Sequence, residues 1–285
     1  GGETFTPIYG LSFDGLTQHM VTFQYPASGG TDGAYLDEER PDHTSADDDR
    51  TYSFWMKASE TDLNASPFGY STSKRESLVL NYNATYKYIR YSLGNNYWVK
   101  WPNNSAQTDG QWHHWMIVSD VSDLSSCKLY IDGDEIEGGI PITGGGDAGP
   151  HDQGLTIGAN RHRASNNEHF KGSLTNFAVF TGLLTADDAI SHYNGGIANK
   201  DLTNESGLQV YWKMDEGTGT NIIDYGPGSC EDQSGASITC DGTLEYNTKN
   251  QEYDLSHCNQ GGNSCSDENV QWVTVMELNQ VGERI

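Results

Sequence analysis

The chain has 285 residues, and its 40 Asp and Glu against 16 Lys and Arg give a formal net charge of −24. This charge repels phosphate, which excludes general binding to nucleic acid and disfavours attachment to an anionic membrane surface. The 7 Trp, 16 Tyr and 8 Phe supply large apolar surfaces for a folded core, unlike the aromatic-poor composition of disordered chains. At this length one large β domain is the expected organisation.

No run of apolar residues reaches the roughly 20 that a membrane-spanning helix needs, so we expect no membrane insertion. The first residues, Gly1-Gly2-Glu3-Thr4, lack the basic and apolar regions of a signal peptide. Because the sequence does not begin with Met, we expect a processed or excerpted product, and whether a leader or anchor was removed stays open.

Short stretches of alternating apolar and polar residues make up most of the chain. Tyr52, Phe54 and Met56, for example, fall on one face of a stretch whose other face carries Ser53 and Lys57. This period of two predicts a half-buried strand. Many such strands with turn residues between them favour an antiparallel sandwich. Strands are predicted at residues 51–57, 77–82, 86–93, 112–119, 127–131, 155–157, 173–180, 208–214 and 270–277.

One helix is predicted. Thr185 is followed three residues later by Asp188, a spacing that satisfies the free N–H groups of a first helical turn. Gly195 and Gly196 end the helix. Residues 37–49 form an acidic stretch without strand character, which predicts a surface loop.

Several motifs follow one another in the order of a known fold. They are an opening strand at residues 11–15, a strand at 52–57, a Trp-His-His-Trp strand start at 112–115, a Leu-Tyr-Ile-Asp-Gly hairpin within 128–133, strands at 155–158 and 170–174, and a helix start at 184–190. Together they resemble the laminin-G-like members of the concanavalin A-type lectin and glucanase superfamily. The resemblance covers about residues 8–200. It implies an all-β, antiparallel two-sheet jelly-roll sandwich with one short helix and a C-terminal extension.

The segment 211–219 is similar to the strand that usually begins such a domain, but here it follows the other motifs. We interpret residues 207–246 as completing the empty edge of a jelly roll that spans residues 1–250, with 251–285 as a cysteine-containing extension and terminal strand. The alternative is the start of a second, truncated copy. Fewer than 80 residues follow position 207, and half a sandwich would expose unpaired strand edges, which favours the first interpretation.

The acidic residues do not form a glycosidase pattern. Glucanases with this fold resemble one another in a Glu-x-Asp-x-x-Glu strand that places carboxylates on one face. The nearest acidic groups here have another spacing and lie in a predicted hairpin turn: Asp132, Asp134, Glu135 and Glu137. No Ser-His-Asp arrangement is recognisable, although one could be assembled from distant residues. We therefore predict that the protein is not an enzyme.

The five cysteines bear on the cellular compartment. Cys127 is in phase with Leu129 and Ile131, so we expect a free thiol in the core. The other four lie in polar loops: Cys230, Cys240, Cys258 and Cys265. Disulfides between neighbours along the chain are the simplest pairing, although four cysteines allow three connectivities. A zinc site is the alternative, but the spacings do not match Cys-x₂₋₄-Cys. Disulfides would indicate an oxidising compartment.

Asn-x-Ser/Thr sequons also fit an extracellular protein, and they matter only if the source organism glycosylates. They occur at Asn64, Asn83, Asn103 and Asn204.

Calcium is the one cofactor that the sequence suggests. Asp47 and Asp49 offer the hard oxygen ligands that suit this ion, but the spacing is unlike an EF-hand and a solvated acidic insertion is the favoured alternative. Laminin-G and pentraxin relatives bind calcium through edge loops that resemble residues 70–76 and 159–169. Glu168 is the acidic residue of the second loop, although most of the expected acidic pair is absent.

The same two loops carry 4 of the 16 basic residues: Lys74, Arg75, Arg161 and Arg163. The resemblance places these loops together at one edge of the sandwich. Guanidinium groups match carboxylate and sulfate oxygens, and the rings of Tyr97 and Trp98 can stack on sugar rings. We predict a site for an acidic or sulfated glycan that also includes Asn160, Asn166 and Asn167. The alternative is that the basic residues form intramolecular salt bridges.

The sequence therefore predicts a non-catalytic extracellular carbohydrate-binding or adhesion module whose partner is a glycan. The resemblance extends to laminin-G-like segments of marine phage, viral and bacterial surface proteins, so a virion or cell-surface appendage is the expected location. The alternative is a self-associating assembly subunit of a virion decoration, fibre or surface filament. Residues 270–278 are apolar on both faces and could pair with a neighbouring subunit.

Overall fold

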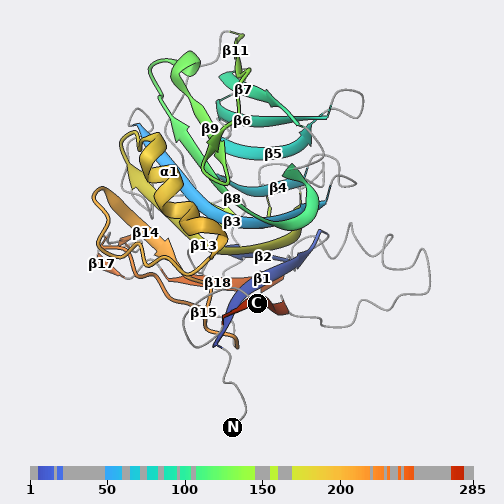
Figure 1. The fold of residues 1–285 in the computed structure, drawn as a ribbon, viewed down its shortest axis with the longest axis vertical. Coiled ribbons are helices and arrows are strands. Elements are labelled where there is room, and N and C mark those ends of the chain that lie inside the picture. Colours follow the sequence, from blue (N-terminus) through green and yellow to red (C-terminus); the bar gives the residue numbers. More distant parts are fainter. Residues whose placement is uncertain are drawn as a thin grey trace, which may run out of the picture.

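The structure is a computed structural model that describes residues 6–15, 18–21, 49–59, 65–70, 76–82, 87–94, 97–103, 107–144, 155–159, 169–218, 221–227, 230–231, 237–238, 241–246 and 271–278. Its strands form two large antiparallel sheets, and one helix lies beside them (Figure 1). The all-β sandwich predicted from the sequence is therefore confirmed.

One sheet has eight strands. Their order is β10 (Asp134–Glu135), β9 (Lys128–Ile131), β8 (Asp109–Ser119), β3 (Arg50–Ser59), β13 (Lys171–Thr181), β1 (Thr6–Asp14) and β19 (Gln271–Leu278), and β14 (Leu208–Trp212) also pairs with β13. β1 pairs with β13 between Lys171 and Leu174, and β14 pairs with it between Phe177 and Phe180. Segments from the two ends of the chain thus share one edge of β13.

The other sheet has nine strands. Their order is β11 (Ile140–Thr143), β7 (Tyr97–Pro102), β6 (Tyr88–Gly94), β5 (Glu76–Tyr82), β4 (Ala65–Tyr70), β12 (Leu155–Ile157), β2 (Gln18–Val21), β18 (Gly242–Tyr246) and β15 (Asn221–Ile222). β16 (Cys230–Glu231) and β17 (Ser237–Ile238) form a separate hairpin. The residues after position 207 thus contribute strands to both large sheets. The predicted domain boundary at residues 250 and 251 lies outside the described residues and stays a prediction.

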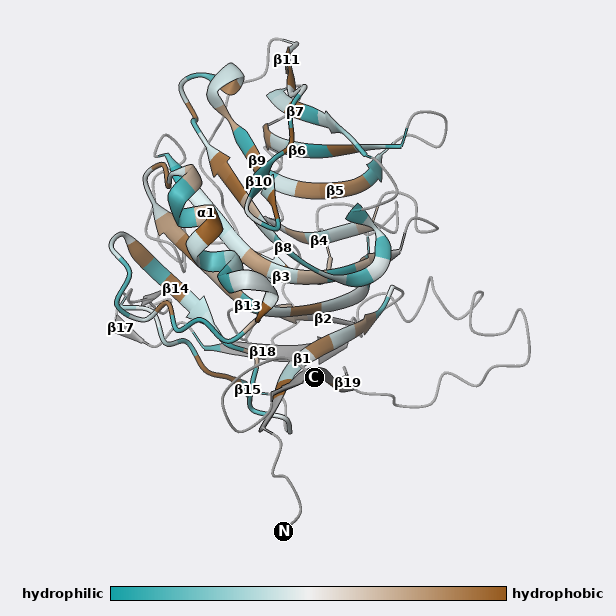
Figure 2. Cartoon of the chain, in the orientation of Figure 1, coloured by the Kyte–Doolittle hydropathy of each residue, from teal (hydrophilic) through white to brown (hydrophobic). Residues whose placement is uncertain are grey.

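An aromatic core fills the space between the two sheets. The Phe54 and Phe177 rings of the eight-stranded sheet are stacked with 5.2 Å between their centroids, and Phe68 of β4 meets Phe177 edge-on at 5.4 Å. The Tyr52 ring lies 4.7 Å from that of Phe68. These four side chains are fully buried. Figure 2 shows the corresponding hydrophobic stretches along strands such as β5. Burial of this apolar surface is the main stabilising contribution.

The predicted helix is α1 (Ala186–Tyr193), which packs on the outer face of the eight-stranded sheet. Thr185 and Asp188 form the expected capping box, in which the Thr185 N–H donates to Asp188 Oδ2 at 2.7 Å. Ala189 of the helix is buried against Met116 and Val118 of β8. The helix therefore adds a third layer to the sandwich.

The predicted hairpin joins β9 and β10 through Asp132 and Gly133, whose φ angles are 55° and 84°. A Cβ at Gly133 would also lie 3.2 Å from the Ile190 Cα of α1, so glycine suits both the turn and the close approach of the helix. The Asp132 carboxylate accepts from His113 Nδ1 at 2.6 Å and from the His114 N–H at 2.8 Å. This acidic turn therefore stabilises the neighbouring strand.

The nine predicted strands correspond to β3, β5, β6, β8, β9, β12, β13, β14 and β19, with bounds that differ by a few residues. The predicted half-burial of β3 is wrong at Ser53, which is 0% exposed. Tyr52, Phe54 and Met56 face the core as expected, but α1 and the segment that follows it cover the opposite face. Cys127 is a free thiol buried in the core, as predicted, and burial raises its pKa to about 12.

A buried ion pair crosses the core at one end of the sandwich. Arg50 of β3 and Glu76 of β5 are both 0% exposed, and Arg50 Nη1 lies 3.1 Å from Glu76 Oε2. The Tyr52 hydroxyl donates to Glu76 Oε1 at 2.6 Å, and the Tyr91 hydroxyl donates to the same oxygen. Burial raises the pKa of Tyr91 well above its usual value, so this hydroxyl keeps its proton. The network links the two sheets through polar contacts.

Glu76→Gln is expected to lower the free energy of unfolding by about 3–5 kcal/mol, because it leaves the Arg50 charge buried beside a neutral group. Tyr91→Phe removes one donor and keeps the ion pair, so it should cost about 1.5 kcal/mol. Denaturant unfolding followed by tryptophan fluorescence measures both values. A smaller cost for Glu76→Gln than for Tyr91→Phe would contradict this view of the network.

Candidate functional site

Three strands of the nine-stranded sheet carry aromatic and basic residues on their outer face. In β6 and β7 the side chains of Ile89, Tyr91, Val99 and Trp101 face the core. The residues between them point the other way, because successive side chains of a strand alternate between the two faces. The partly exposed Trp98 therefore lies on the outer face, and its strand neighbour across the sheet is Ser92 of β6.

A β-bulge brings one more ring to this face. Leu78 and Leu80 of β5 point into the core, and an unbroken alternation would direct Tyr82 there as well. The register shifts between Val79 and Tyr82, and Asn81 adopts a left-handed conformation with φ of 50°. Tyr82 therefore pairs with Tyr88 across the strands, and their ring centroids are 5.4 Å apart.

The resulting surface is called here the aromatic–cationic patch, and its members are Tyr82, Tyr88, Arg90, Trp98 and Lys100. The Tyr88 and Trp98 rings are nearly parallel, with an interplanar angle of 4° and centroids 6.0 Å apart. Arg90 Cζ lies 3.9 Å from the centroid of the Tyr82 ring, and Lys100 Nζ lies 5.1 Å from that of Tyr88. Burial raises the pKa of Tyr88, and Tyr82 raises it further, while Arg90 lowers it. Such a patch can stack on a flat apolar ligand face and bind an anion.

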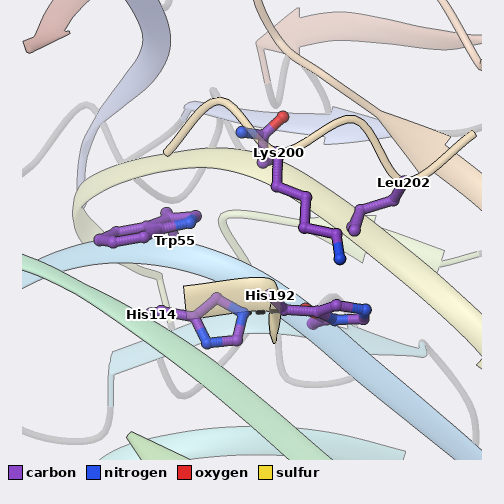
Figure 3. A pocket seen from close by; sticks show the side chains of 7 residues that line it. Trp55, His114, His192, Lys200 and Leu202 are labelled. Carbon is purple, nitrogen blue, oxygen red and sulfur yellow. Dashed lines mark hydrogen bonds between the residues drawn. The ribbon is translucent and has the colours of Figure 1, made fainter. Parts of the chain in front are cut away.

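A second polar cluster lies beneath α1, on the opposite side of the sandwich (Figure 3). Ser53 Oγ of β3 lies 2.9 Å from His114 Nε2 of β8 and 2.9 Å from His192 Nδ1 of α1. Trp55, Lys200 and Leu202 surround the two imidazoles. The space between them is about 10 Å³, which is roughly enough for one water molecule.

This cluster does not have the properties of a catalytic serine site. Ser53 is fully buried, and within the described part of the chain no carboxylate orients His114, whose Nδ1 has no hydrogen-bond partner. Burial lowers the pKa of His114 to about 3, and the nearby His192 lowers it as well. Burial and then Lys200 lower the pKa of His192 to about 4. The two neutral histidines hold the helix to the sheet.

A family model described as the concanavalin A-like lectin/glucanases superfamily matches residues 28–189 of the chain. The chain belongs to this superfamily. The laminin-G-like resemblance inferred from the motifs is thereby confirmed.

The chain is similar in fold to a solved structure. A candidate carbohydrate binding protein from Bacteroides ovatus has a TM-score of 0.52 and 17% sequence identity, over 84% of this chain and 58% of that one. The chain thus spans little more than half of that protein. The CBM40 of the Ruminococcus gnavus IT-sialidase has a TM-score of 0.44 and 15% identity, over 67% of this chain and 98% of that one. No curated protein matches the sequence.

Of the residues predicted for glycan binding, the structure describes only Tyr97 and Trp98. Trp98 belongs to the patch, whereas Tyr97 packs against the core and its hydroxyl donates to the Val121 carbonyl at 3.3 Å. The remaining predicted residues lie outside the described residues: Lys74, Arg75, Asn160, Arg161, Arg163, Asn166 and Asn167. The sequence reasoning missed the other four patch residues. The polar faces of residues 86–93 and 97–102 carried a signal for Tyr88, Arg90 and Lys100, but nothing in the sequence indicated the bulge at Tyr82.

The predicted calcium ligands are only partly described. One Asp49 oxygen accepts from the Val121 N–H at 3.0 Å, while Asp47 and Glu168 lie outside the described residues. Among the residues that the structure describes, no group of three or more His, Cys, Asp or Glu could hold a metal ion. The calcium site stays a prediction.

The disulfides and glycosylation sites also stay predictions. Only the backbone of Cys230 is described, and Cys240, Cys258, Cys265 and Asn83 lie outside the described part. Asn204 is exposed. Asn103 donates from Nδ2 to Asn81 Oδ1 at 2.5 Å. In the described segments no helix is long and apolar enough to cross a membrane.

The buried histidines His114 and His192 are expected to destabilise the protein as the pH falls below about 6.5, whereas Asp224, whose pKa burial raises to about 6, contributes in the opposite sense. The lowered pKa values of His114 and His192 mean that the unfolded chain binds protons which the folded chain excludes. The stability that the pair contributes above pH 6.5 is therefore lost as the pH falls towards those values. The loss approaches roughly 1.4 kcal/mol per pH unit for each histidine. Denaturant unfolding between about pH 7.5 and about pH 5 measures it.

His192→Asn keeps an acceptor for Ser53 and removes one titrating group, so its acid slope should be shallower. His113→Asn is the matched control. The hydrogen bond to Asp132 raises the pKa of His113, so the stability it contributes is present below pH 6.5 and is lost as the pH rises through the raised value. The control should change the slope only above pH 6.5. If the free energy of unfolding of His192→Asn fell with pH below 6.5 as steeply as that of the unchanged protein, His192 would not be a source of the acid sensitivity.

Proposed function

We propose that the protein is a non-catalytic carbohydrate-binding module, and that the aromatic–cationic patch is its binding surface. The observation that carries this proposal is the parallel pair of Tyr88 and Trp98 rings on a partly exposed sheet face, with Tyr82 beside them. Aromatic rings offer large, rigid surfaces at binding sites, and their faces match the apolar C–H faces of sugars. The similarity in fold to the Bacteroides ovatus protein supports the proposal.

The acidic residues favour binding over hydrolysis. A glycosidase needs two carboxyl groups about 5–10 Å apart beside its substrate. None of the patch members is acidic. Asp132, the nearest candidate from the sequence, directs both carboxylate oxygens to the strand that carries His113 and His114.

We infer an adhesion role outside the cell, on a virion or a cell-surface appendage.

Self-assembly is a second candidate function, and the position of β19 favours it. Among the described strands, β19 is the last of the eight-stranded sheet, and β1 is its partner on one side. A terminal strand can add a strand from a neighbouring subunit. Light scattering over a wide concentration range tests this function, because a monodisperse monomer at every concentration would exclude it.

Trp98→Ala is expected to weaken glycan binding at least roughly tenfold, because it removes a central ring of the stacking surface. Trp112→Ala is the matched control: Trp112 is half-buried on the outer face of the other sheet, beside Trp55. A glycan array identifies the ligands, and isothermal titration calorimetry with the strongest of them gives the affinities. Both variants are compared at equal folded fractions, measured by near-ultraviolet circular dichroism. Equal affinities for the two variants would contradict the proposed surface.

A further inference from the structure

We infer that the aromatic–cationic patch selects glycans that carry carboxylate or sulfate groups, and that Arg90 and Lys100 recognise these groups. This inference rests on the proposed function and specifies its ligand class. The sequence predicted an acidic ligand too, but assigned it to loop residues such as Arg161. The patch presents the required chemistry on a sheet face instead.

The first argument is a pair of like charges. Arg90 of β6 and Lys100 of β7 are directly opposite each other in the antiparallel register, so their side chains leave the same face with Cβ atoms about 5 Å apart. Two cations in this arrangement repel each other. Among the described residues no carboxylate forms an ion pair with Lys100. An anionic ligand group beside Lys100 would offset its charge.

The second argument is that the rings hold these cations in place. Arg90 Cζ lies 3.9 Å from the Tyr82 ring centroid and 6.0 Å from that of Trp98, and Arg90 is only 8% exposed. A guanidinium held in this way keeps its planar fork of five donors in a fixed orientation, and it can share them between the fold and a ligand. The Lys100 ammonium beside Tyr88 adds a point charge. Fixed donors reduce the entropy that binding costs.

The third argument is the arrangement of apolar and charged groups. Ile142 of β11 is the strand neighbour of Trp98, and Ile140, which is 51% exposed, is the strand neighbour of Lys100. The patch thus has an apolar side at β11 and a cationic centre at β6 and β7. A sugar ring over Trp98 and Tyr88 would place an acidic substituent within reach of the cations. Carboxylates of uronic or sialic acids and sulfate esters share this chemistry.

Lys100→Gln tests the inference on the full chain, with an array that carries uronate, sialylated, sulfated and neutral glycans. We expect anionic glycans to be bound preferentially, and Lys100→Gln to weaken their binding roughly tenfold with little effect on neutral glycans. Lys128→Gln is the matched control, because it removes the same charge from a partly exposed lysine on the other sheet. Arg90→Lys keeps the charge but loses the fork, so it should weaken carboxylate and sulfate binding as well.

The outcomes separate this inference from the proposed function. The inference is supported if Lys100→Gln weakens the binding of anionic glycans selectively. The class of glycan that binds most strongly then identifies the anionic group: a carboxylate if it is a uronate or sialylated glycan, and a sulfate ester if it is a sulfated glycan. The inference is overturned if Lys100→Gln weakens the binding of neutral and anionic glycans equally, or if Lys100→Gln and Lys128→Gln behave alike. The proposed function still stands in that case if Trp98→Ala weakens glycan binding. If the array shows no binding, or Trp98→Ala has no effect, the proposed function fails and the inference fails with it.

Discussion

The shared aromatic core between the two sheets is the constraint on which the rest of the structure depends. Tyr52 and Phe54 of one sheet contact Phe68 of the other, so each strand over this core must direct every second side chain inward. Val99 therefore points to the core and Trp98 away from it. The patch is a consequence of this alternation, because the strands that bury the core also fix the orientation of the residues between core positions.

Two β-bulges, in β5 and β13, place side chains where the regular alternation of a strand would not. The bulge before Tyr82 turns a ring to the outer face of one sheet. In β13 the register shifts between Thr175 and Ala178, where β1 gives way to β14. There Asn176 donates to the Ala198 carbonyl at 2.5 Å and accepts from the Tyr211 hydroxyl at 2.9 Å. The two bulges thus serve both outer faces: one completes the patch, and the other connects β14 to the segment after α1.

The sequence contains most of the fold, because a period of two and a capping box are local patterns. The strands around Tyr52 and the helix start at Thr185 follow from a few neighbouring residues. Ser53 shows the limit: its polarity indicates an exposed face, and only the tertiary position of α1 reveals that this face is buried. The candidate site shows the same limit. The sequence predicts Trp98 as an aromatic binding residue, but the contact of Trp98 with Tyr88 depends on the register between the strands.

The groups that affect stability in acid and the proposed binding surface lie on opposite outer faces of the sandwich. The histidines beneath α1 are held neutral by burial, so their protonation in acid destabilises the fold at the face that carries the helix. The patch lies on the other sheet and contains no histidine and no carboxylate. Sites that share no contacts behave nearly independently, so a change at Ser53 or His192 should alter unfolding without altering the surface around Trp98. Loss of binding in acid would then report loss of folded protein, whereas loss of binding in Lys100→Gln at neutral pH would report recognition itself.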